Sequence, residues 1–263
     1  MADGGVGLAS LVNNKFVNSL PFSFYIQSKG KHHLNPLEIL FEDEWLVAIN
    51  KPHNLLVHRT QISEEKEHFA LQILKEQLGI WLTPCHRLDR KTSGILLFAK
   101  NKEAGKLAMK MFENHEFEKE YIALVRGFIA DEGEIDKPLV KENGTLQNAF
   151  TRFKRLQNFE IPVEVSRYST SRYSLVQVIP TTGRMHQIRR HMASLRHYVI
   201  GDKVHGERHH NKMFEEKFGL NTMLLHANLL RFKHPITQDK IEFVAEMQNE
   251  FKQILSSLEE ANI

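Results

Sequence analysis

The sequence places a cation and a carboxylate two residues apart, Arg87 and Asp89, before a polar turn and an apolar run. The turn closes at Gly94, because glycine tolerates left-handed backbone and close backbone approach. The run Ile95–Ala99 has no polar break, which is typical of a fully buried strand. A rigid strand could present the Asp89 carboxylate, as nucleophile or base, on the loop that leads into it. The residues alone leave open a structural turn that merely caps the strand.

Two other groups of residues could suggest chemistry, and the sequence argues against both. Cys85 and His86 are adjacent, and adjacent side chains on extended chain point to opposite faces, so we expect no thiol–imidazole dyad. Four histidines could suggest zinc: His205, His209, His210 and His226. They lack CxxC and HExxH spacing, and we therefore predict no metal site.

Hydrophobic periodicity predicts the elements that position these groups. Strands are expected over 38–41, 45–49, 95–99, 117–125, 172–179, 223–232 and 240–244. Helices are expected over 64–78, 101–112, 184–195 and 247–258, with an N-cap at Asn101 and a helix end at Gly79. Residues 131–134 read as a turn, 140–165 as a connector, and 201–219 as a loop with a short helix. This mixture lacks regular βαβ alternation, so the predicted class is α+β.

The helix predicted over 184–195 carries an apolar stripe of Met185, Ile188, Met192 and Leu195. Arg189 lies at the edge of this stripe, while His186 and Arg190 point further toward water. An arginine at such an edge can bury its stem and present its guanidinium to a partner.

Composition indicates an ordinary soluble protein, with 263 residues, 41% hydrophobic and 25% charged. A single cysteine excludes an internal disulfide framework and favours a reducing compartment. No apolar run is long enough to span a bilayer, and no secretory signal is recognisable, so a cytoplasmic location is expected. Residues 1–36 are expected to form an N-terminal extension, partly disordered or packed on the body, and residues 37–263 one catalytic domain.

Positive charge is concentrated in one part of the chain, although the net charge is only +3. Residues 145–200 hold nine Lys or Arg and two acids. We call these nine cations the basic block: Arg152, Lys154, Arg155, Arg167, Arg172, Arg184, Arg189, Arg190 and Arg196. Such a block is a candidate track for RNA phosphates, and Arg184 and Arg190 are predicted to contact substrate.

The stretch His86–Gly94, with its apolar strand, resembles the catalytic signature of the RluA-type pseudouridine synthases. Three later blocks fit the same family in the same order: Tyr121–Val125, Thr182–His191 and Leu225–Ala227. The resemblance implies a mixed, largely antiparallel sheet flanked by helices and divided by an active-site cleft. It also implies isomerisation of uridine in RNA to its C-glycoside without a cofactor.

The resemblance also implies roles for single residues. Asp89 matches the catalytic carboxylate, and Arg189 the arginine that pairs with it and keeps it ionised. Tyr121 matches the tyrosine that stacks on the flipped base. Arg87 matches the residue that helps to extrude the nucleotide, and Leu225 is expected to pack against the base.

Within the family, the chain is most similar to TruC-like enzymes, which modify uridine 65 of tRNA. The similarity extends over Arg167–Tyr173, Arg190–His197 and Ile200–Asp202. A shortened connector and an unusual N-terminal extension keep a ribosomal RNA target open. A non-catalytic RNA-binding module also stays open, as does a glycoside-type hydrolase, which would normally need a second carboxylate. A monomer that binds RNA and no membrane is expected.

Overall fold

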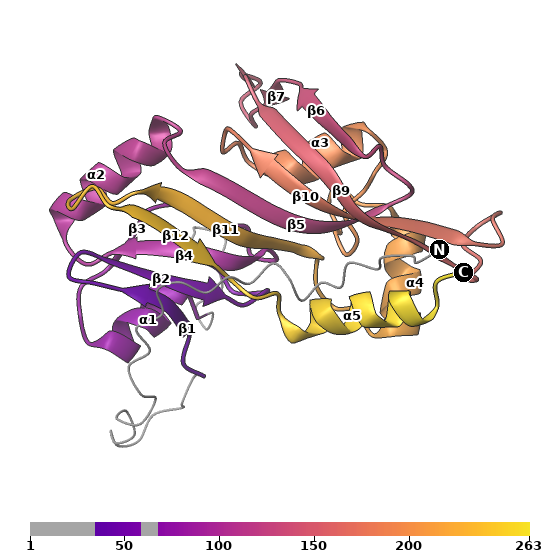
Figure 1. Cartoon of the computed structure of the whole chain (residues 1–263), viewed down its shortest axis with the longest axis horizontal. Helices are drawn as coiled ribbons and strands as arrows, with labels where there is room; N and C mark the ends of the chain where they lie inside the picture. The colour runs from indigo at the N-terminus through magenta and orange to yellow at the C-terminus, as the bar shows by residue number, and fades with distance from the viewer. Residues whose placement is uncertain (1–34, 59–67) are drawn as a thin grey trace, which may run out of the picture. The chain divides into compact units, whose positions relative to one another are not determined.

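The computed structural model describes residues 35–58 and 68–263, and Figure 1 shows their arrangement. Predictions for residues 1–34 and 64–67 lie outside the described residues. Ten strands form the main sheet: β1 (Glu38–Glu42), β2 (Leu46–Lys51), β3 (Thr83–Pro84), β4 (Ser93–Ala99), β5 (Glu118–Arg126), β6 (Glu132–Asp136), β9 (Phe150–Ile161), β10 (Ser171–Pro180), β11 (Leu225–Lys233) and β12 (Lys240–Val244). A separate small hairpin pairs β7 (Leu139–Val140) with β8 (Leu146–Gln147).

The sheet is mixed and largely antiparallel, which confirms the predicted α+β class. Its order is β1-β2-β4-β11-β5-β10-β9-β6, with β12 beside β11 and β3 beside β4. Among its described strand pairs, β4 and β11 alone run parallel, and only His226–Ser93 and Ala227–Gly94 are in register there. Gly94 has φ of +107°, and a Cβ on it would collide with the backbone of Ala227. The close approach predicted for this glycine is therefore confirmed.

Five helices lie in the described part of the chain: α1 (Ala70–Leu78), α2 (Lys102–Glu113), α3 (Gln187–Ser194), α4 (Arg208–Phe218) and α5 (Asn249–Glu260). None of these helices is long and apolar enough to cross a lipid bilayer. One core cluster packs α2 against β2, β4 and the end of β11. A second packs α4 and α5 against β9 and β10, and a third packs α3 against β5 and β10. The helices thus bury one stripe each and hold the sheet rigid.

Several local predictions are confirmed. All seven residues of β4 are buried, as its unbroken apolar run predicted. Asn101 caps α2 by accepting a hydrogen bond from the Ala104 amide, at 2.9 Å. Gly79 ends α1 in the left-handed conformation. The hairpin of β1 and β2 and the pair of β11 and β12 also lie where predicted.

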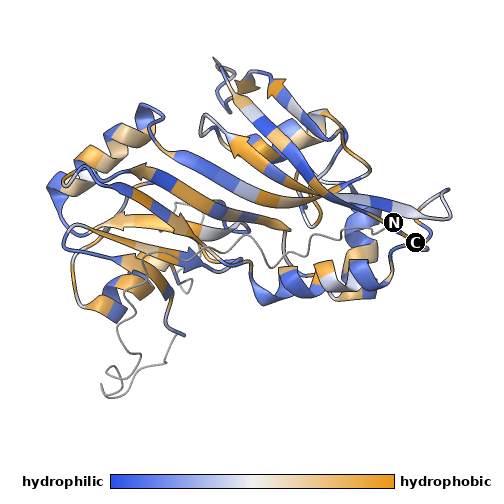
Figure 2. Cartoon of the chain, in the orientation of Figure 1, coloured by the Kyte–Doolittle hydropathy of each residue, from blue (hydrophilic) through white to orange (hydrophobic). Residues whose placement is uncertain are grey.

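Two predictions in the middle of the chain are wrong. The predicted turn at 131–134 lies largely in strand β6, and the predicted connector over 140–165 contains the 12-residue strand β9. Buried residues such as Thr151, Phe153 and Phe159 alternate along much of β9 with exposed or half-buried ones, several of them charged. Figure 2 shows this mixture of hydrophobic and hydrophilic positions along β9. The alternation is that of a strand with one wet face, and the density of charge obscured it.

The helix predicted over 184–195 is shorter than expected. α3 begins at Gln187, because His186 has a left-handed backbone with φ of +53°. The Gln187 side chain accepts hydrogen bonds from the Thr182 hydroxyl (2.6 Å) and the Arg184 amide (3.0 Å), and so holds the preceding residues in a turn. Met185 and Leu195 consequently fall outside the helix and are exposed, so the predicted apolar stripe is wrong at both ends.

Candidate active site

Asp89 lies on the loop between β3 and β4, and a backbone hydrogen bond and buried neighbouring residues hold this loop in place. The Asp89 carbonyl accepts a hydrogen bond from the Thr92 amide at 3.1 Å, and Leu88 and Thr92 are buried. The side chain of Asp89 remains 24% exposed. The buried neighbours fix the loop, and the partly exposed carboxylate lies on the loop that leads into β4, the position expected from the sequence.

Lys51, at the end of β2, fastens this loop to the sheet. Its fully buried ammonium donates to the carbonyls of Pro52 (2.8 Å), Leu55 (2.9 Å) and Arg90 (3.3 Å). Burial lowers the pKa of Lys51 to about 7, against the opposing attraction of Asp89. The partner at Arg90 is 39 residues away in sequence, so the local sequence pattern around Lys51 could not predict this contact.

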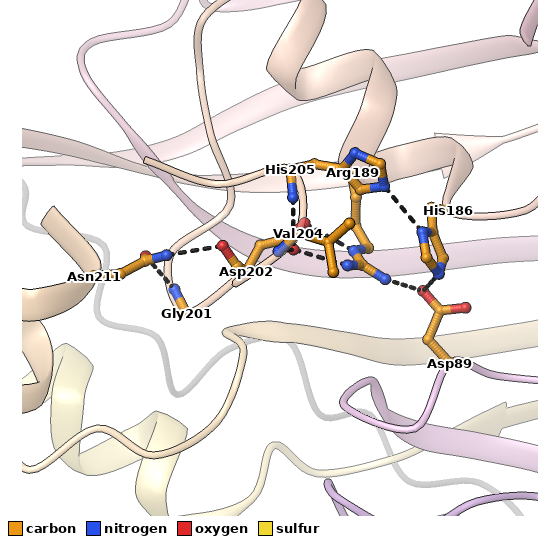
Figure 3. A network of polar contacts seen from close by, with 8 residues as sticks. All are labelled: Asp89, His186, Arg189, Gly201, Asp202, Val204, His205 and Asn211. Atoms are coloured by element: carbon orange, nitrogen blue, oxygen red, sulfur yellow. Dashed lines mark hydrogen bonds and ion pairs between the residues drawn. The ribbon is translucent and has the colours of Figure 1, made fainter. Parts of the chain in front are cut away.

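Arg189 connects Asp89 to a second carboxylate, as Figure 3 shows. Its Nη1 donates to Asp89 Oδ2 at 2.9 Å. Its Nε and Nη2 form a bidentate pair with Asp202, at 2.8 and 2.7 Å. The predicted pairing of Arg189 with Asp89 is present in this geometry. However, Arg189 is only 7% exposed and lies inside the protein, where its guanidinium donates hydrogen bonds to both carboxylates.

Asp202 is the residue that the sequence reasoning missed. It is 1% exposed, and its Oδ1 also accepts the amides of Val204 (2.9 Å) and His205 (3.0 Å). Burial alone would raise the pKa of Asp202, but the hydrogen bonds from Arg189 and these amides outweigh burial and hold it below its usual value. Asp202 therefore fixes the orientation of Arg189 from the side opposite to Asp89.

Tyr121 is on β5, in register with Ala227 of β11 and Val178 of β10. Burial and the nearby charge of Asp89 raise the pKa of its phenol, so the hydroxyl stays protonated. Leu225 is 3% exposed and belongs to the core cluster against which Tyr121 packs. Tyr121 is thus near enough to Asp89 for that charge to raise its pKa, and its ring packs against the cluster that contains Leu225.

A cavity of about 290 Å³ opens beside Asp89. Its lining includes Arg87, Asp89, Lys91, His186, Arg189 and Lys203. Four of these side chains carry a positive charge around one carboxylate, a polarity that suits an anionic substrate. Of the predicted site residues, Asp89, Arg189 and Arg87 line this cavity, whereas Tyr121, Arg184, Arg190 and Leu225 are not part of its lining.

The basic block is divided by the fold. Arg152 and Lys154 on β9 are in register with Glu134 and Glu132 on β6. Arg155 pairs with Asp131, and Arg172 with Glu160 at 3.1 Å. Arg189 is occupied by its two carboxylates. Arg184 is half-buried, and its Nε donates to the Asn148 carbonyl at 3.1 Å. Fewer cations of the basic block are therefore available to bind RNA phosphates than the sequence count suggested.

The other suggestive residues lie in separate structural settings. Burial raises the pKa of Cys85 to about 12, and that of His86 is lowered to about 3 while its ring stacks on Phe112. His210 bonds Tyr173 at 2.7 Å, and His226 bonds Ser93 at 2.9 Å. Within the described residues, no three His, Cys, Asp or Glu side chains are placed to hold a metal ion.

Residues 45–194 match the family model described as RNA pseudouridylate synthase. The chain belongs to this family. A tRNA pseudouridine synthase C from Vibrio vulnificus is 43% identical over 234 residues, covering 85% of this chain and 96% of the relative. The protein of the same name from Haemophilus ducreyi is 44% identical over 230 residues, covering 84% and 95%.

The fold agrees with this membership. The solved structure of human RNA pseudouridylate synthase domain containing 1 superposes with a TM-score of 0.65 at 23% identity, covering 88% of this chain and 98% of that one. A pseudouridylate synthase is an isomerase that acts on RNA, so the enzyme class predicted from the sequence is confirmed. The family match includes Asp89, Tyr121 and Arg189, whereas Asp202 and Leu225 lie beyond its end.

Proposed function

We propose that this pseudouridine synthase isomerises uridine to pseudouridine in tRNA, at position 65, with Asp89 as the catalytic carboxylate. The observation that carries the proposal is the placement of Asp89 at the wall of a positively charged cavity, 2.9 Å from Arg189. Similarity over most of the chain to proteins named tRNA pseudouridine synthase C supports the choice of tRNA.

The proposed reaction breaks the C1′–N1 bond, turns the base within the cavity and joins C1′ to C5. Asp89 acts on the nucleotide either as a nucleophile or as the base that removes the C2′ proton. Arg189 neutralises the carboxylate and, held by Asp202, fixes its direction. Tyr121 provides a π surface for the base, because a flipped base loses its stacking in the helix. Leu225 belongs to the core cluster against which the Tyr121 ring packs.

RNA is proposed to bind along the cations near the cavity. Arg87 is exposed at the cavity rim and is placed to help extrude the nucleotide. Arg184 and Arg190 are half-buried on the turn before α3 and on α3 itself, where they can contact phosphates. Such contacts would offset the free energy of roughly a few kcal/mol that flipping a paired base costs.

Further parts of the proposal concern the whole chain. The compact unit Asn35–Ile263 supports a single catalytic domain close to the expected 37–263. Action as a monomer is also part of the proposal. A tRNA substrate and a single cysteine support a cytoplasmic location.

The test uses tRNA transcribed with tritium at uridine C5. Formation of the C1′–C5 bond expels that hydrogen, so tritium release measures isomerisation. We expect stoichiometric release by the wild type and none by Asp89→Ala. Asp131→Ala is the matched control, because that carboxylate is 83% exposed in a surface pair with Arg155.

Mapping the modified nucleotide then tests position 65. Release from ribosomal RNA transcripts but not from tRNA would favour a ribosomal RNA substrate. Tight, salt-sensitive binding without release from either RNA would leave a non-catalytic binding module. Liberation of free uracil would instead identify a hydrolase.

A further inference from the structure

Two lysines without a role in the proposed reaction line the cavity beside Asp89. Lys91 lies on the loop between β3 and β4, shortly after Asp89, and it is half-buried. Lys203 follows Asp202 on the loop between α3 and α4, and it is exposed. Neither lysine belongs to the basic block, because both lie outside residues 145–200. Only the fold brings these two cations to one cavity.

Hydrogen bonds hold the backbone that carries Lys91. The Thr92 amide donates to the Asp89 carbonyl at 3.1 Å, which closes a turn with Lys91 inside it. The buried Lys51 ammonium donates to the carbonyl of the preceding residue, Arg90, at 3.3 Å. These bonds fix the backbone of Lys91 relative to Asp89, so less conformational entropy is lost when the lysine binds a ligand.

The backbone around Lys203 is held by the same carboxylate that orients Arg189. Asp202 Oδ1 accepts the amides of Val204 at 2.9 Å and of His205 at 3.0 Å. Figure 3 shows Asp202 bonded both to the Arg189 guanidinium and to this loop. Lys203 lies between Asp202 and the two anchored amides, so the network that places Arg189 also places Lys203.

Within the described residues, the ammonium groups of Lys91 and Lys203 form no ion pair and no hydrogen bond. The carboxylates of Asp89 and Asp202 both pair with Arg189 instead. Partial burial and the charge of Lys203 lower the pKa of Lys91, against the pull of Asp202. The two lysines are therefore close enough to repel each other, and an anion bound between them would offset this repulsion.

We propose that Lys91 and Lys203 together bind one phosphate that adjoins the target nucleotide of the RNA. This inference rests on the proposed function. Phosphate is the anion that RNA brings to the cavity, and a lysine ammonium binds it as a point charge. The sugar on which Asp89 acts carries a phosphate on either side, so a pair of cations beside Asp89 is placed to meet one of them.

This contact would serve the step in which the base turns. After the C1′–N1 bond breaks, the base rotates while C1′ must stay in place to join C5. A phosphate held by two cations anchors the sugar to which it is covalently linked, so the rotating base meets a fixed C1′. Lys91 and Lys203 would contact the phosphate and not the reacting atoms, so they are substrate-binding residues.

The other cations of the cavity suit this phosphate less well. Arg189 is buried and uses its guanidinium for two carboxylates. Arg90 donates from Nε to the Asn54 carbonyl at 3.3 Å. Arg87 is exposed and also lines the cavity, so it is the competing cation that the experiment must distinguish.

The test removes one negative charge from the RNA and the two positive charges from the protein. Equilibrium binding is measured for tRNA with a neutral methylphosphonate in place of the phosphate on one or the other side of the target uridine. A 2′-deoxynucleotide precedes each methylphosphonate to prevent strand cleavage, and the reference RNA has the same deoxynucleotide with an ordinary phosphate. For the wild type, we expect one of the two neutral linkages to weaken binding about tenfold. For the double variant Lys91→Gln, Lys203→Gln, the same linkage should weaken binding less than about twofold.

Control variants separate charge from other effects of substitution. Lys203→Arg keeps the charge and should retain the tenfold effect of the neutral linkage. Lys212→Gln is the same change at a 68% exposed lysine that pairs with Glu216 outside this cavity, and it should behave as wild type. A tenfold effect that persists in the double lysine variant, or no effect of either linkage in the wild type, would overturn the proposal. An effect that only Arg87→Gln abolishes would assign the phosphate to Arg87 instead.

Tritium release by the wild type separates the two levels of the proposal. No release from tRNA would overturn the proposed function, and the phosphate assignment with it. Release from tRNA, together with an undiminished effect of the neutral linkage in the double lysine variant, would overturn only the phosphate assignment.

Discussion

At the scale of single residues, Asp202 determines whether Arg189 can hold Asp89. In Asp202→Asn, the amide group of the new side chain would face the N–H donors of Arg189, and the buried cation would lose its main partner. Breaking a buried pair in this way costs about 3–5 kcal/mol. We expect the free energy of unfolding in urea to fall by about 3 kcal/mol, and tritium release to slow. Glu242→Gln, in a half-exposed pair with Arg231, should cost less than about 1 kcal/mol.

The same carboxylate predicts a pH dependence with a defined sign. The pKa of Asp202 in the folded protein lies below its ordinary value of 3.8. Its contribution to stability is therefore present above pH 3.8 and is lost as the pH falls through the lower folded value. Urea denaturation between pH 2.5 and 5 (roughly) should show this loss in the wild type. A loss of equal size in Asp202→Asn would contradict the assignment.

The residues of the candidate site differ in how far the sequence could predict them. Asp89, Tyr121 and Arg189 lie in long motif blocks, and the resemblance identified them before any coordinates. Asp202 comes 13 residues after Arg189, in a loop without periodicity, and its role depends on packing. The Gly201–Asp202 pair was noticed only as part of the similarity to one subgroup.

At the scale of elements, the contact between β4 and β11 requires a glycine. Gly94 has φ of +107°, and an added Cβ would overlap the Ala227 backbone, which cannot move without breaking the pairing. We expect Gly94→Ala to lower the free energy of unfolding by about 2–4 kcal/mol, from backbone strain plus overpacking. Gly144→Ala is the matched control, because its φ is +83° but no atom lies within 4 Å of the added Cβ. It should cost only about 1–2 kcal/mol. Equal losses in urea denaturation would show that the Ala227 contact is unimportant.

Elements were predictable where burial imposes a simple pattern. β4 is apolar throughout, and Asn101 and Gly79 are strong end signals. β9 was missed because only one of its faces is buried and its other face is dense in charge. α3 was predicted too long because the hydrogen bonds of Gln187 to the preceding turn, which stop the helix, are invisible in periodicity.

At the scale of the whole molecule, pairing within the fold determines which cations remain available to RNA. Arg152 and Arg184 both belong to the basic block, yet Arg152 lies opposite Glu134, whereas Arg184 lies near another cation, Lys119, and lowers its pKa. Each phosphate contact releases counterions, so each contact steepens the slope of log K for RNA binding against log salt concentration by about one. We expect Arg184→Gln to weaken tRNA binding and reduce that slope by about one, measured from 50 to 200 mM salt (roughly).

Arg152→Gln is the same change on the paired face, and it should leave the slope unaltered. Equal reductions in the two variants would mean that the acids of β6 do not screen β9 and that RNA covers both faces. A smaller slope in Arg152→Gln alone would indicate that RNA binds along β9 and not near the cavity. The net charge of +3 does not indicate which face binds RNA. Binding depends instead on where the folded protein has cations without a carboxylate neighbour.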